Sequence, residues 1–199
     1  MKRSLRVAIA DDEPDMRDFL EKCLPRLGHQ VIAVAENGRQ LLEQCAYARP
    51  DLVVSDVRMP DLDGVAAAEA LAAHGPIPVV LVTGYRTPDA DRWAQIGHVF
   101  AYLMKPITEE QLGPAIELAI RRFEQFQALG REVTELRRSL EDRKLIERAK
   151  GIVTRRVGLS ESEAHRRLQR LARQNNRKLA DLARDVLGAE ETFAALDAH

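Results

Sequence analysis

The sequence is poor in cysteine and in aromatic residues, and it has no long uninterrupted apolar run. Its two cysteines, Cys23 and Cys45, are too few and too widely spaced for a disulfide framework or a metal knuckle. No apolar run approaches the roughly 20 residues that a membrane-spanning helix needs, and no apolar signal segment precedes the first predicted strand. These absences argue against a disulfide-rich secreted domain and a membrane protein, and they predict a cytoplasmic protein with no membrane partner.

The charge of the chain is balanced overall but unevenly distributed. The net charge is -1 over 199 residues, yet residues 1–111 are acidic, and residues 143–188 hold 13 Lys and Arg against five Asp and Glu. A basic segment of this kind is a candidate surface for a polyanion, although Arg also accumulates on solvated helix faces. The length allows one domain of ordinary size and a smaller one, for which the charges predict different partners.

Short apolar runs alternate with amphipathic segments over the first half of the chain. Strands are predicted at 5–10, 31–35, 52–55, 77–82 and 99–103. Helices are predicted between them, at 14–28, 38–48, 64–73 and 88–96, and another begins near Thr108. Regular alternation of strand and helix favours an α/β fold with a parallel, doubly wound sheet.

Polar side chains stand at the ends of four of these predicted strands. They are Asp11 and Asp12, Asp56, Thr83 and Lys105. Each alone has an ordinary explanation as a strand terminator, a helix cap, a turn hydroxyl or a solvated charge. Because the carboxyl ends of parallel strands meet at the ligand-binding edge of an open sheet, their joint occurrence in order favours a single site.

The acidic members of this set predict a magnesium site with a phosphoacceptor. Clustered carboxylates repel one another unless a cation neutralises them, and hard oxygen ligands suit Mg²⁺. A carboxylate beside Mg²⁺ can attack a phosphoryl group, so Asp56 is the predicted phosphoacceptor, with the Thr83 hydroxyl and the Lys105 ammonium holding phosphoryl oxygens. The predicted metal ligands are Asp11, Asp12, Asp56 and the backbone carbonyl of Arg58.

Residues from about 5 to 122 resemble the receiver domain of bacterial two-component response regulators. The residues that carry the resemblance are Asp11-Asp12, Asp56, Met59-Pro60, Gly64, Thr83, Tyr102 and Lys105-Pro106. The resemblance implies a (βα)5 fold with strand order 2-1-3-4-5, a Mg²⁺ requirement, and phosphorylation of Asp56 from a histidine kinase. It also implies that Thr83 and Tyr102 move on phosphorylation. The predicted receiver domain is residues 1–122.

One long helix is predicted after the receiver strands. It starts at a capping-box pattern at Thr108, bends at Pro114 without ending, and reaches about Arg156 with interruptions only at Gly130 and Gly151. Apolar residues recur in it at spacings of three and four, so residues 112–142 are predicted to be a helical linker with a coiled-coil seam. We expect a homodimer through this seam, with packing inside one chain as the alternative.

The basic segment 143–188 is predicted to form a three-helix bundle. A capping-box pattern at Ser160-Glu161-Ser162-Glu163 starts its second helix, Gly188 closes its third, and residues 189–199 follow as an acidic tail. The patterns Ala149-Lys150-Gly151 and Gly158-Leu159-Ser160-Glu161 resemble the ANTAR module. That resemblance implies binding to RNA hairpins in nascent leader transcripts and antitermination of transcription.

Arginine and lysine supply the predicted RNA contacts, because their side chains pair well with phosphate. The predicted contacts are Lys150, Arg155, Arg156, Arg166, Arg167, Arg170, Arg173, Arg177 and Lys178. The segment 143–188 contains no Phe, Tyr or Trp. This favours recognition of phosphates and shape over stacking of bases on aromatic rings.

The sequence therefore predicts a non-enzymatic RNA-binding antiterminator that is switched by phosphorylation. Three alternatives stay open: a DNA-binding regulator that uses the bundle as a helix-turn-helix, a phosphatase with Asp56 as nucleophile, and a protein-binding adaptor. The phosphatase is disfavoured, because such hydrolases generally place a second acid two residues after the nucleophile, where this chain has Arg58.

Overall fold

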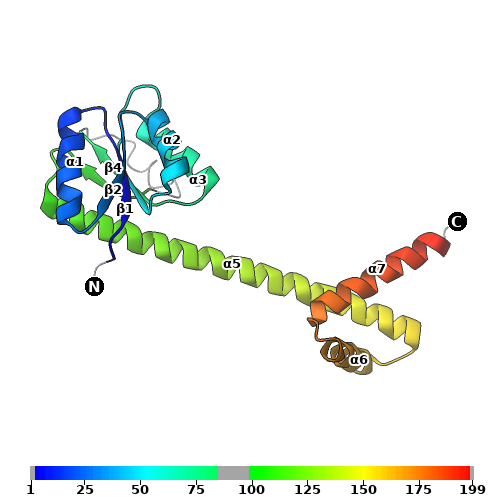
Figure 1. Cartoon of the computed structure of the whole chain (residues 1–199). Helices are drawn as coiled ribbons and strands as arrows, with labels where there is room; N and C mark the ends of the chain where they lie inside the picture. The colour runs from blue at the N-terminus through cyan, green and yellow to red at the C-terminus, as the bar shows by residue number, and fades with distance from the viewer. Residues whose placement is uncertain (1–2, 85–98, 198–199) are drawn as a thin grey trace. The chain divides into compact units, whose positions relative to one another are not determined.

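The computed structural model of the protein describes residues 3–84 and 99–197 (Figure 1). The chain divides into two compact units, Met1–Gln127 and Ala128–His199. The helix predicted at 88–96 lies outside the described residues. Within the two described stretches, no helix combines the length and the hydropathy that crossing a bilayer demands.

The first unit is built on a five-stranded parallel sheet. Its strands are β1 (Arg6–Ala10), β2 (Gln30–Ala35), β3 (Leu52–Asp56), β4 (Val79–Thr83) and β5 (Val99–Met104). Their order is β2-β1-β3-β4-β5, which confirms the predicted receiver topology. β3 and β4 are buried along their whole length, as expected for apolar strands of a parallel sheet that is covered on both faces.

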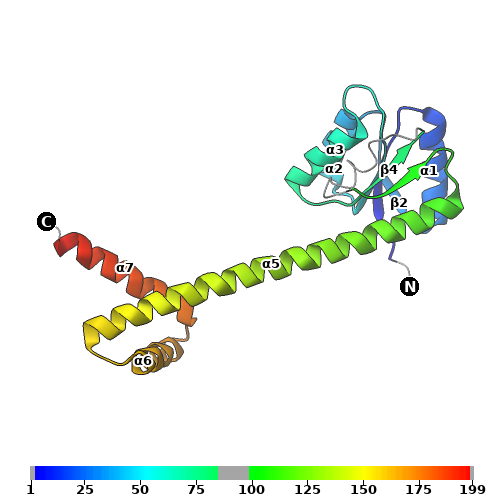
Figure 2. The same ribbon diagram turned by 180° about the vertical axis from the view of Figure 1, so that it is seen from behind.

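Helices cover both faces of this sheet (Figures 1 and 2). They are α1 (Pro14–Arg26), α2 (Gly38–Ala48), α3 (Gly64–His74) and the first part of α5 (Glu109–Val157). One apolar layer joins α1 and α5 to the sheet through residues such as Leu20 and Leu112, and the other joins α2 and α3 through Leu41 and Leu71. The two layers leave the carboxyl ends of the strands open for a site.

Local hydrogen bonds explain where two of these helices begin. The Asn37 side chain accepts a hydrogen bond from the Gln40 N–H at 2.9 Å and caps α2, and the Asp63 side chain accepts one from the Ala66 N–H at 2.7 Å and caps α3. At the start of α5 half of the predicted capping box forms, since the Gln111 side chain accepts from the Thr108 N–H at 3.2 Å.

The helix α5 runs for 49 residues and passes Pro114, as predicted. Pro114 lies in the second turn, beyond the first four N–H groups that have no partner inside the helix, so it removes one backbone hydrogen bond, yet α5 continues through it. The predicted interruptions at Gly130 and Gly151 do not occur, and both glycines are helical. Their low helix propensity, about 1 kcal/mol below alanine each, does not outweigh the flanking helix formers.

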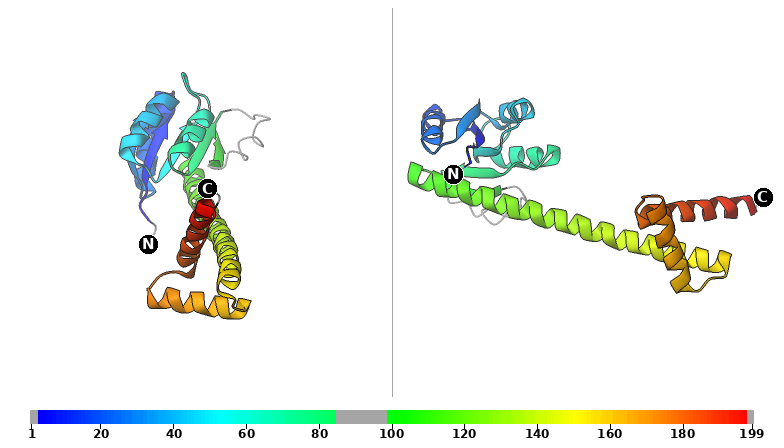
Figure 3. Two further views of the ribbon diagram at one scale, coloured as in Figure 1. Left: turned by 90° about the vertical axis from the view of Figure 1, so that its right-hand side faces the viewer. Right: turned by 60° about the horizontal axis from the view of Figure 1, so that its bottom comes forward.

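The second unit packs the last turns of α5 against α6 (Glu161–Gln174) and α7 (Leu179–Asp197) (Figure 3). Its core consists of Ala149, Leu168, Ala172, Leu182 and Ala183. The predicted capping box at the start of α6 is present: the Ser160 hydroxyl accepts from the Glu163 N–H, and the Glu163 carboxylate accepts from the Ser160 N–H at 3.0 Å.

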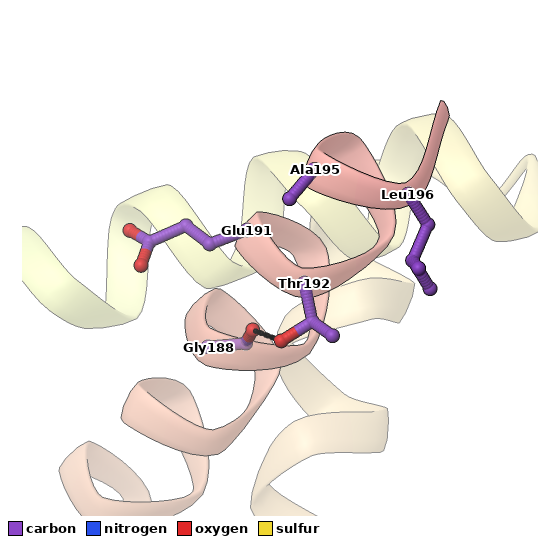
Figure 4. A pocket seen from close by; sticks show the side chains of 5 residues that line it. All are labelled: Gly188, Glu191, Thr192, Ala195 and Leu196. Carbon is purple, nitrogen blue, oxygen red and sulfur yellow. Dashed lines mark hydrogen bonds between the residues drawn. The ribbon is translucent and has the colours of Figure 1, made fainter. Parts of the chain in front are cut away.

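The prediction that Gly188 ends the third helix of the bundle is wrong. α7 continues to Asp197, and the Thr192 hydroxyl donates a hydrogen bond to the Gly188 carbonyl at 2.8 Å (Figure 4). A glycine ends a helix when it adopts a left-handed conformation, as Gly158 does after α5 with a φ of 71°. Gly188 stays helical and is followed by helix-forming residues, so the predicted acidic tail is largely a continuation of α7.

Candidate functional site

Three carboxylates converge at the carboxyl edge of the sheet. Asp11 follows β1, Asp56 ends β3, and these two strands are parallel neighbours. One oxygen from each of Asp11, Asp12 and Asp56 lies within 4.8 Å of the others. Asp11 and Asp56 are buried, whereas Asp12 is exposed. The structure thus brings together the three carboxylates that the strand ends predicted.

The Lys105 ammonium reaches into this cluster from the loop after β5. Its Nζ lies 3.0 Å from Asp11 Oδ2, 3.5 Å from Asp56 Oδ1 and 3.1 Å from Glu13 Oε2. Glu13 is a site residue that the strand-end pattern missed, because it lies one residue before α1. Its position directly after Asp11-Asp12 was the signal that could have found it.

Burial sets the electrostatics of the carboxylates. Desolvation raises the pKa of Asp11, and the Glu13 N–H and the Lys105 ammonium offset this only in part. Desolvation also raises the pKa of Asp56, which Lys105 lowers and the Asp11 charge raises further. The two acids therefore disfavour each other's ionisation in the absence of a bound metal ion.

Lys105 remains a cation in these surroundings. Burial alone would lower the pKa of its ammonium, but the hydrogen bonds to Asp11 and Glu13 outweigh burial and raise it. One positive charge thus faces three carboxylates, those of Asp11, Glu13 and Asp56.

The cluster fits a magnesium ion. Asp11 Oδ2 is buried, and no donor in the described part of the chain is oriented to hydrogen-bond it, although the Lys105 ammonium lies nearby. A buried carboxylate oxygen that accepts no hydrogen bond, beside two further carboxylates, belongs to the donor set that a hard divalent cation prefers. Asp11, Asp12 and Asp56 are the side chains that would hold the ion. The contribution of the Arg58 carbonyl stays a prediction.

A glycine closes the loop over Asp56. A Cβ atom on Gly64 would lie 1.9 Å from the Asp56 carbonyl oxygen, so only glycine allows this backbone approach. The Gly64 N–H donates to the Val57 carbonyl at 3.0 Å, and the Arg58 N–H donates to Asp56 Oδ2 at 3.2 Å. The loop between β3 and α3 is thereby held against the predicted phosphoacceptor.

The two predicted switch residues differ in exposure. Thr83 ends β4 next to β3 and is only 4% exposed, whereas Tyr102 lies on β5 and is 54% exposed. The Lys105 N–H donates to the Thr83 carbonyl at 2.7 Å, which ties the Lys105 loop to the end of β4. The side chains of Thr83 and Lys105 therefore border the same edge of the sheet as Asp56.

Three of the nine predicted RNA-contacting residues are engaged by carboxylates within the second unit. Lys150 contacts Glu147 and, at 3.2 Å, Glu161, and its side chain is only 15% exposed. Arg156 Nε lies 2.9 Å from Glu190, with the guanidinium 5.5 Å from the centre of the Phe193 ring, and Arg177 pairs with Asp185. The tertiary structure brings these carboxylates to the three basic residues, and the ion pairs reduce the positive charge that is available to phosphate.

The exposed face of α6 carries most of the remaining charge. Arg166, Arg170 and Arg173 are spaced by four and three residues and therefore share one face, with Arg167 beside them. Ala164, Leu168 and Ala172 of the same helix are buried, on its opposite face. Within the described part of the chain none of these four arginines forms an ion pair, and the same holds for Arg155 and Lys178, which are also exposed.

Comparisons with known proteins agree with the description of the first unit and with that of the second unit. Residues 7–117 match the family model of the response regulator receiver domain, and residues 134–187 match that of the ANTAR domain. An acidic strand-end site on a receiver fold defines the class of two-component response regulators. The chain belongs to the family of response regulators that joins a receiver domain to an ANTAR domain.

Individual relatives support the same conclusion. The chain is 38% identical over 186 residues to the transcriptional regulatory protein PdtaR of Mycobacterium tuberculosis, covering 92% of this chain and 91% of that protein. Among solved structures it resembles the signal receiver domain of the response regulator NarL from Mycobacterium tuberculosis, with a TM-score of 0.54 and 26% identity over 58% of this chain and 94% of that one. The chemotaxis protein CheY4 of Vibrio cholerae gives a TM-score of 0.54 and 25% identity over 59% and 99%.

Proposed function

We propose that this response regulator is phosphorylated on Asp56 by a histidine kinase and then controls transcription by binding RNA hairpins, with antitermination as the outcome. The observation that carries the proposal is the convergence of Asp11, Asp12, Asp56 and Lys105 on one edge of the sheet, in a chain that also carries an ANTAR domain. The domains point to a regulator rather than an enzyme. Because a histidine kinase and nascent transcripts meet in the cytoplasm, we place its action there.

The receiver site would perform phosphoryl transfer as follows. Asp11, Asp12 and Asp56 would hold a Mg²⁺ ion, which would neutralise charge on the incoming phosphoryl group. Asp56 attacks the phosphorus of the kinase phosphohistidine, and the imidazole leaves. The Lys105 ammonium, 3.5 Å from Asp56 Oδ1, pairs with a phosphoryl oxygen, and the Thr83 hydroxyl donates to another. The Arg58 carbonyl would be a further ligand of the ion, with water in the remaining positions.

Phosphorylation would then change the contacts of Lys105 and Thr83. The phosphoryl group carries about -1.5 to -2 charges at neutral pH if it resembles other phosphomonoesters, in place of the single negative charge of the free carboxylate, and it competes with Asp11 and Glu13 for the Lys105 ammonium. Lys105 and Thr83 are coupled through the hydrogen bond between their backbones, so the ends of β4 and β5 respond together. Tyr102 on β5 is the residue through which we expect this movement to change the surface.

The second unit is the proposed RNA-binding part. The α6 face with Arg166, Arg167, Arg170 and Arg173 presents guanidinium groups that form no ion pair among the described residues, and such groups fit phosphates in a fixed fork geometry. We assign RNA binding to residues 143–188, phosphorylation to residues 1–122, and the connection between them to residues 112–142. Lys150, Arg156 and Arg177 would contact phosphate only by exchanging their carboxylate partners for it.

A homodimer is the proposed assembly. Leu129, Val133, Leu136 and Leu140 of α5 are all exposed, by 46% or more, and recur at spacings of four, three and four. Such a row is the seam of a coiled coil, and a second copy of the same helix supplies a matching row. We propose that phosphorylation shifts this dimerisation. Sedimentation with and without the phosphoryl donor acetyl phosphate should show two different masses, and one unchanged mass contradicts the shift.

Competition binding tests the nucleic-acid half of the proposal. The full-length protein, with and without acetyl phosphate, is titrated with an RNA stem-loop and with a DNA duplex of the same stem sequence at matched salt. We expect the RNA stem-loop to bind more tightly. Equal or tighter binding of the DNA duplex supports the DNA-binding alternative, and no binding of either leaves the protein-binding adaptor. The salt concentration is matched because binding through phosphate contacts depends steeply on salt, whatever the nucleic acid.

A further inference from the structure

A groove of about 390 Å³ lies in the second unit between the last turns of α5 and the middle of α7. Its α5 wall is formed by Arg148, Gly151, Ile152 and Arg155, and its α7 wall includes Leu187 and Glu191. We call it the α5–α7 groove. Glu191 extends from α7 on the side away from Thr192 and Leu196 (Figure 4).

Gly151 borders open space, and packing within the protein does not require a glycine at this position. A Cβ atom built on it would meet nothing within 4 Å, in contrast to Gly64, whose Cβ would strike the Asp56 carbonyl. Glycine is a poor helix former, so its presence inside α5 is a local disadvantage without a steric reason in this chain. Gly130 and Gly188 have similar free space, but only Gly151 lies in the groove, between Arg148 and Arg155 on the same helix face.

The charges in the groove suit a nucleotide better than a simple anion. Arg148 and Arg155 are exposed, and neither forms an ion pair within residues 3–84 and 99–197. Of the carboxylates that line the groove, Glu147 is taken by Lys150 and Glu190 by Arg156, while Glu191 has no ion pair in the described stretches. The groove thus offers two guanidinium groups and one carboxylate beside the buried, apolar Ile152 and Leu187.

Each part of a nucleotide has a complementary partner in this set. Guanidinium groups pair with phosphate. A flat base fits against the apolar side chains of Ile152 and Leu187, where Gly151 has no side chain to obstruct it. A carboxylate accepts hydrogen bonds from the N–H groups on a base edge, which inorganic phosphate lacks. Bases of RNA loops are unpaired and expose these edges, whereas paired bases do not.

We propose that the α5–α7 groove binds one unpaired nucleotide of an RNA hairpin, with its phosphate on Arg148 and Arg155 and the N–H edge of its base on Glu191. The inference rests on the proposed RNA binding and deepens it. The arginine face of α6 contacts phosphates of any sequence, whereas the groove discriminates an unpaired base from a paired one.

Filling the groove tests the inference. A Cβ atom at position 151 meets no neighbour within 4 Å, so Gly151→Ala adds a methyl group to the groove and Gly151→Leu extends further into it; both residues favour a helix more than glycine does. Gly188→Ala is the matched control: it lies in the same unit, has equally free space, and does not line the groove. Thermal unfolding of each full-length variant should show a stability no lower than that of the wild type.

The probes are an RNA stem-loop pool with a fixed stem and a randomised loop, and the same stem as a blunt RNA duplex. We expect the wild type and Gly188→Ala to bind the stem-loop pool more tightly than the duplex. Gly151→Leu should bind the pool about tenfold more weakly with its duplex affinity unchanged, and Gly151→Ala should be intermediate. Equal binding of the pool by the wild type and Gly151→Leu overturns the groove assignment and leaves the proposed RNA binding intact. Failure of the wild type to bind either RNA overturns both.

Base selection tests the role of Glu191. Sequencing of the loops retained by the wild type should show enrichment, at one loop position, of bases that donate N–H hydrogen bonds. Glu191→Gln changes a pure acceptor into a group that also donates, so this enrichment should change while the affinity for the blunt duplex stays the same. An identical loop preference in the wild type and in Glu191→Gln contradicts the assignment of Glu191.

Discussion

The Lys150 ammonium lies 3.2 Å from the Glu161 carboxylate and so joins the last turns of α5 to the first turn of α6. A second contact to Glu147 leaves the Lys150 side chain mostly covered. The lysine of the Ala149-Lys150-Gly151 pattern therefore has a structural role in positioning the arginine-bearing helix, in addition to any contact with RNA.

Lys150 and Arg170 should respond differently to substitution. Lys150→Met should lower the melting temperature of the second unit and weaken RNA binding while leaving the salt dependence of binding unchanged, because no phosphate contact is lost. Arg170→Gln should leave the melting temperature unchanged and reduce the slope of log affinity against log salt by about 0.7 to 0.9. Circular dichroism melts and RNA titrations at several salt concentrations measure both. A reduced salt slope in Lys150→Met shows instead that Lys150 contacts phosphate directly.

Asp56→Ala should abolish phosphate uptake from acetyl phosphate. The carboxylate is the proposed attacking group, and the remaining acids of the cluster cannot take its place in the sheet. Intact-mass spectrometry measures the uptake, and RNA binding by the unphosphorylated variant serves as the control for folding of the second unit. An Asp56→Ala protein that still carries a stable phosphoryl group would falsify the assignment.

Mg²⁺ should stabilise the first unit at neutral pH and much less in acid. Burial raises the pKa of Asp11 and Asp56 above the ordinary value of 3.8, so the folded, metal-free protein binds more protons than the unfolded chain just above that value. The stability of the metal-free protein therefore falls as the pH rises through this window. Ionised carboxylates bind the cation, so Mg²⁺ reverses the loss, by about 2.7 kcal/mol at a free concentration one hundred times its Kd.

Denaturant unfolding in EDTA and in Mg²⁺, from acid to neutral pH, measures this effect. The single tryptophan, Trp93, belongs to the sequence of the first unit and makes fluorescence selective for it. Asp11→Asn is the control: it should raise the stability of the metal-free protein at neutral pH and remove most of the response to Mg²⁺. A response to Mg²⁺ that is equally large in Asp11→Asn places the ion elsewhere.

Gly64→Ala should destabilise the first unit and slow phosphorylation. Its Cβ would lie 1.9 Å from the Asp56 carbonyl oxygen, so the loop must shift, at a cost of about 1–3 kcal/mol for a forced fit of this kind. Gly84→Ala is the matched control, because a Cβ there meets nothing within 4 Å although the residue follows Thr83 directly. Urea unfolding and the rate of phosphate uptake distinguish the two variants, and equal stabilities would contradict the close approach at Gly64.

Leu136→Asn should dissociate the proposed homodimer without unfolding the monomer. Leu136 is 58% exposed in the single chain, so its replacement costs little folding energy, whereas in a coiled coil it would be buried against its counterpart. Sedimentation equilibrium measures the mass, and Glu135→Gln, one residue away on a different face of the helix, should not change it. A monomeric wild type, or a dimeric Leu136→Asn, shows that this seam does not join two copies.

The strand ends made the receiver site predictable from the sequence. Asp11, Asp56, Thr83 and Lys105 follow apolar runs that form adjacent parallel strands, and the topology then brings their side chains to one edge. Glu13 escaped prediction because its contact with Lys105 joins residues 92 positions apart and depends on side-chain direction. Topology fixes where a strand ends, but it does not fix which neighbouring loop side chain turns inward.

The second unit was less predictable for two physical reasons. The end of α7 depends on the conformation of Gly188, and a glycine permits helical and left-handed backbones almost equally well. The ion pair of Arg156 with Glu190 spans 34 positions and exists only because α7 continues past that glycine. A prediction from the sequence alone counts every basic residue as available to phosphate. In the folded second unit, some of these residues already pair with carboxylates.

The continuation of α7 beyond Gly188 bears on how quickly the protein meets its target. It brings Glu190 onto Arg156, and together with the pairs at Lys150 and Arg177 it leaves six of the nine predicted contacts without an ion pair in the described part of the chain. Diffusional steering of a polyanion depends on the net charge of the surface, not on the number of basic residues. The association rate should therefore depend less steeply on salt than the composition of residues 143–188 suggests, with specificity expressed mainly in how long the complex lasts.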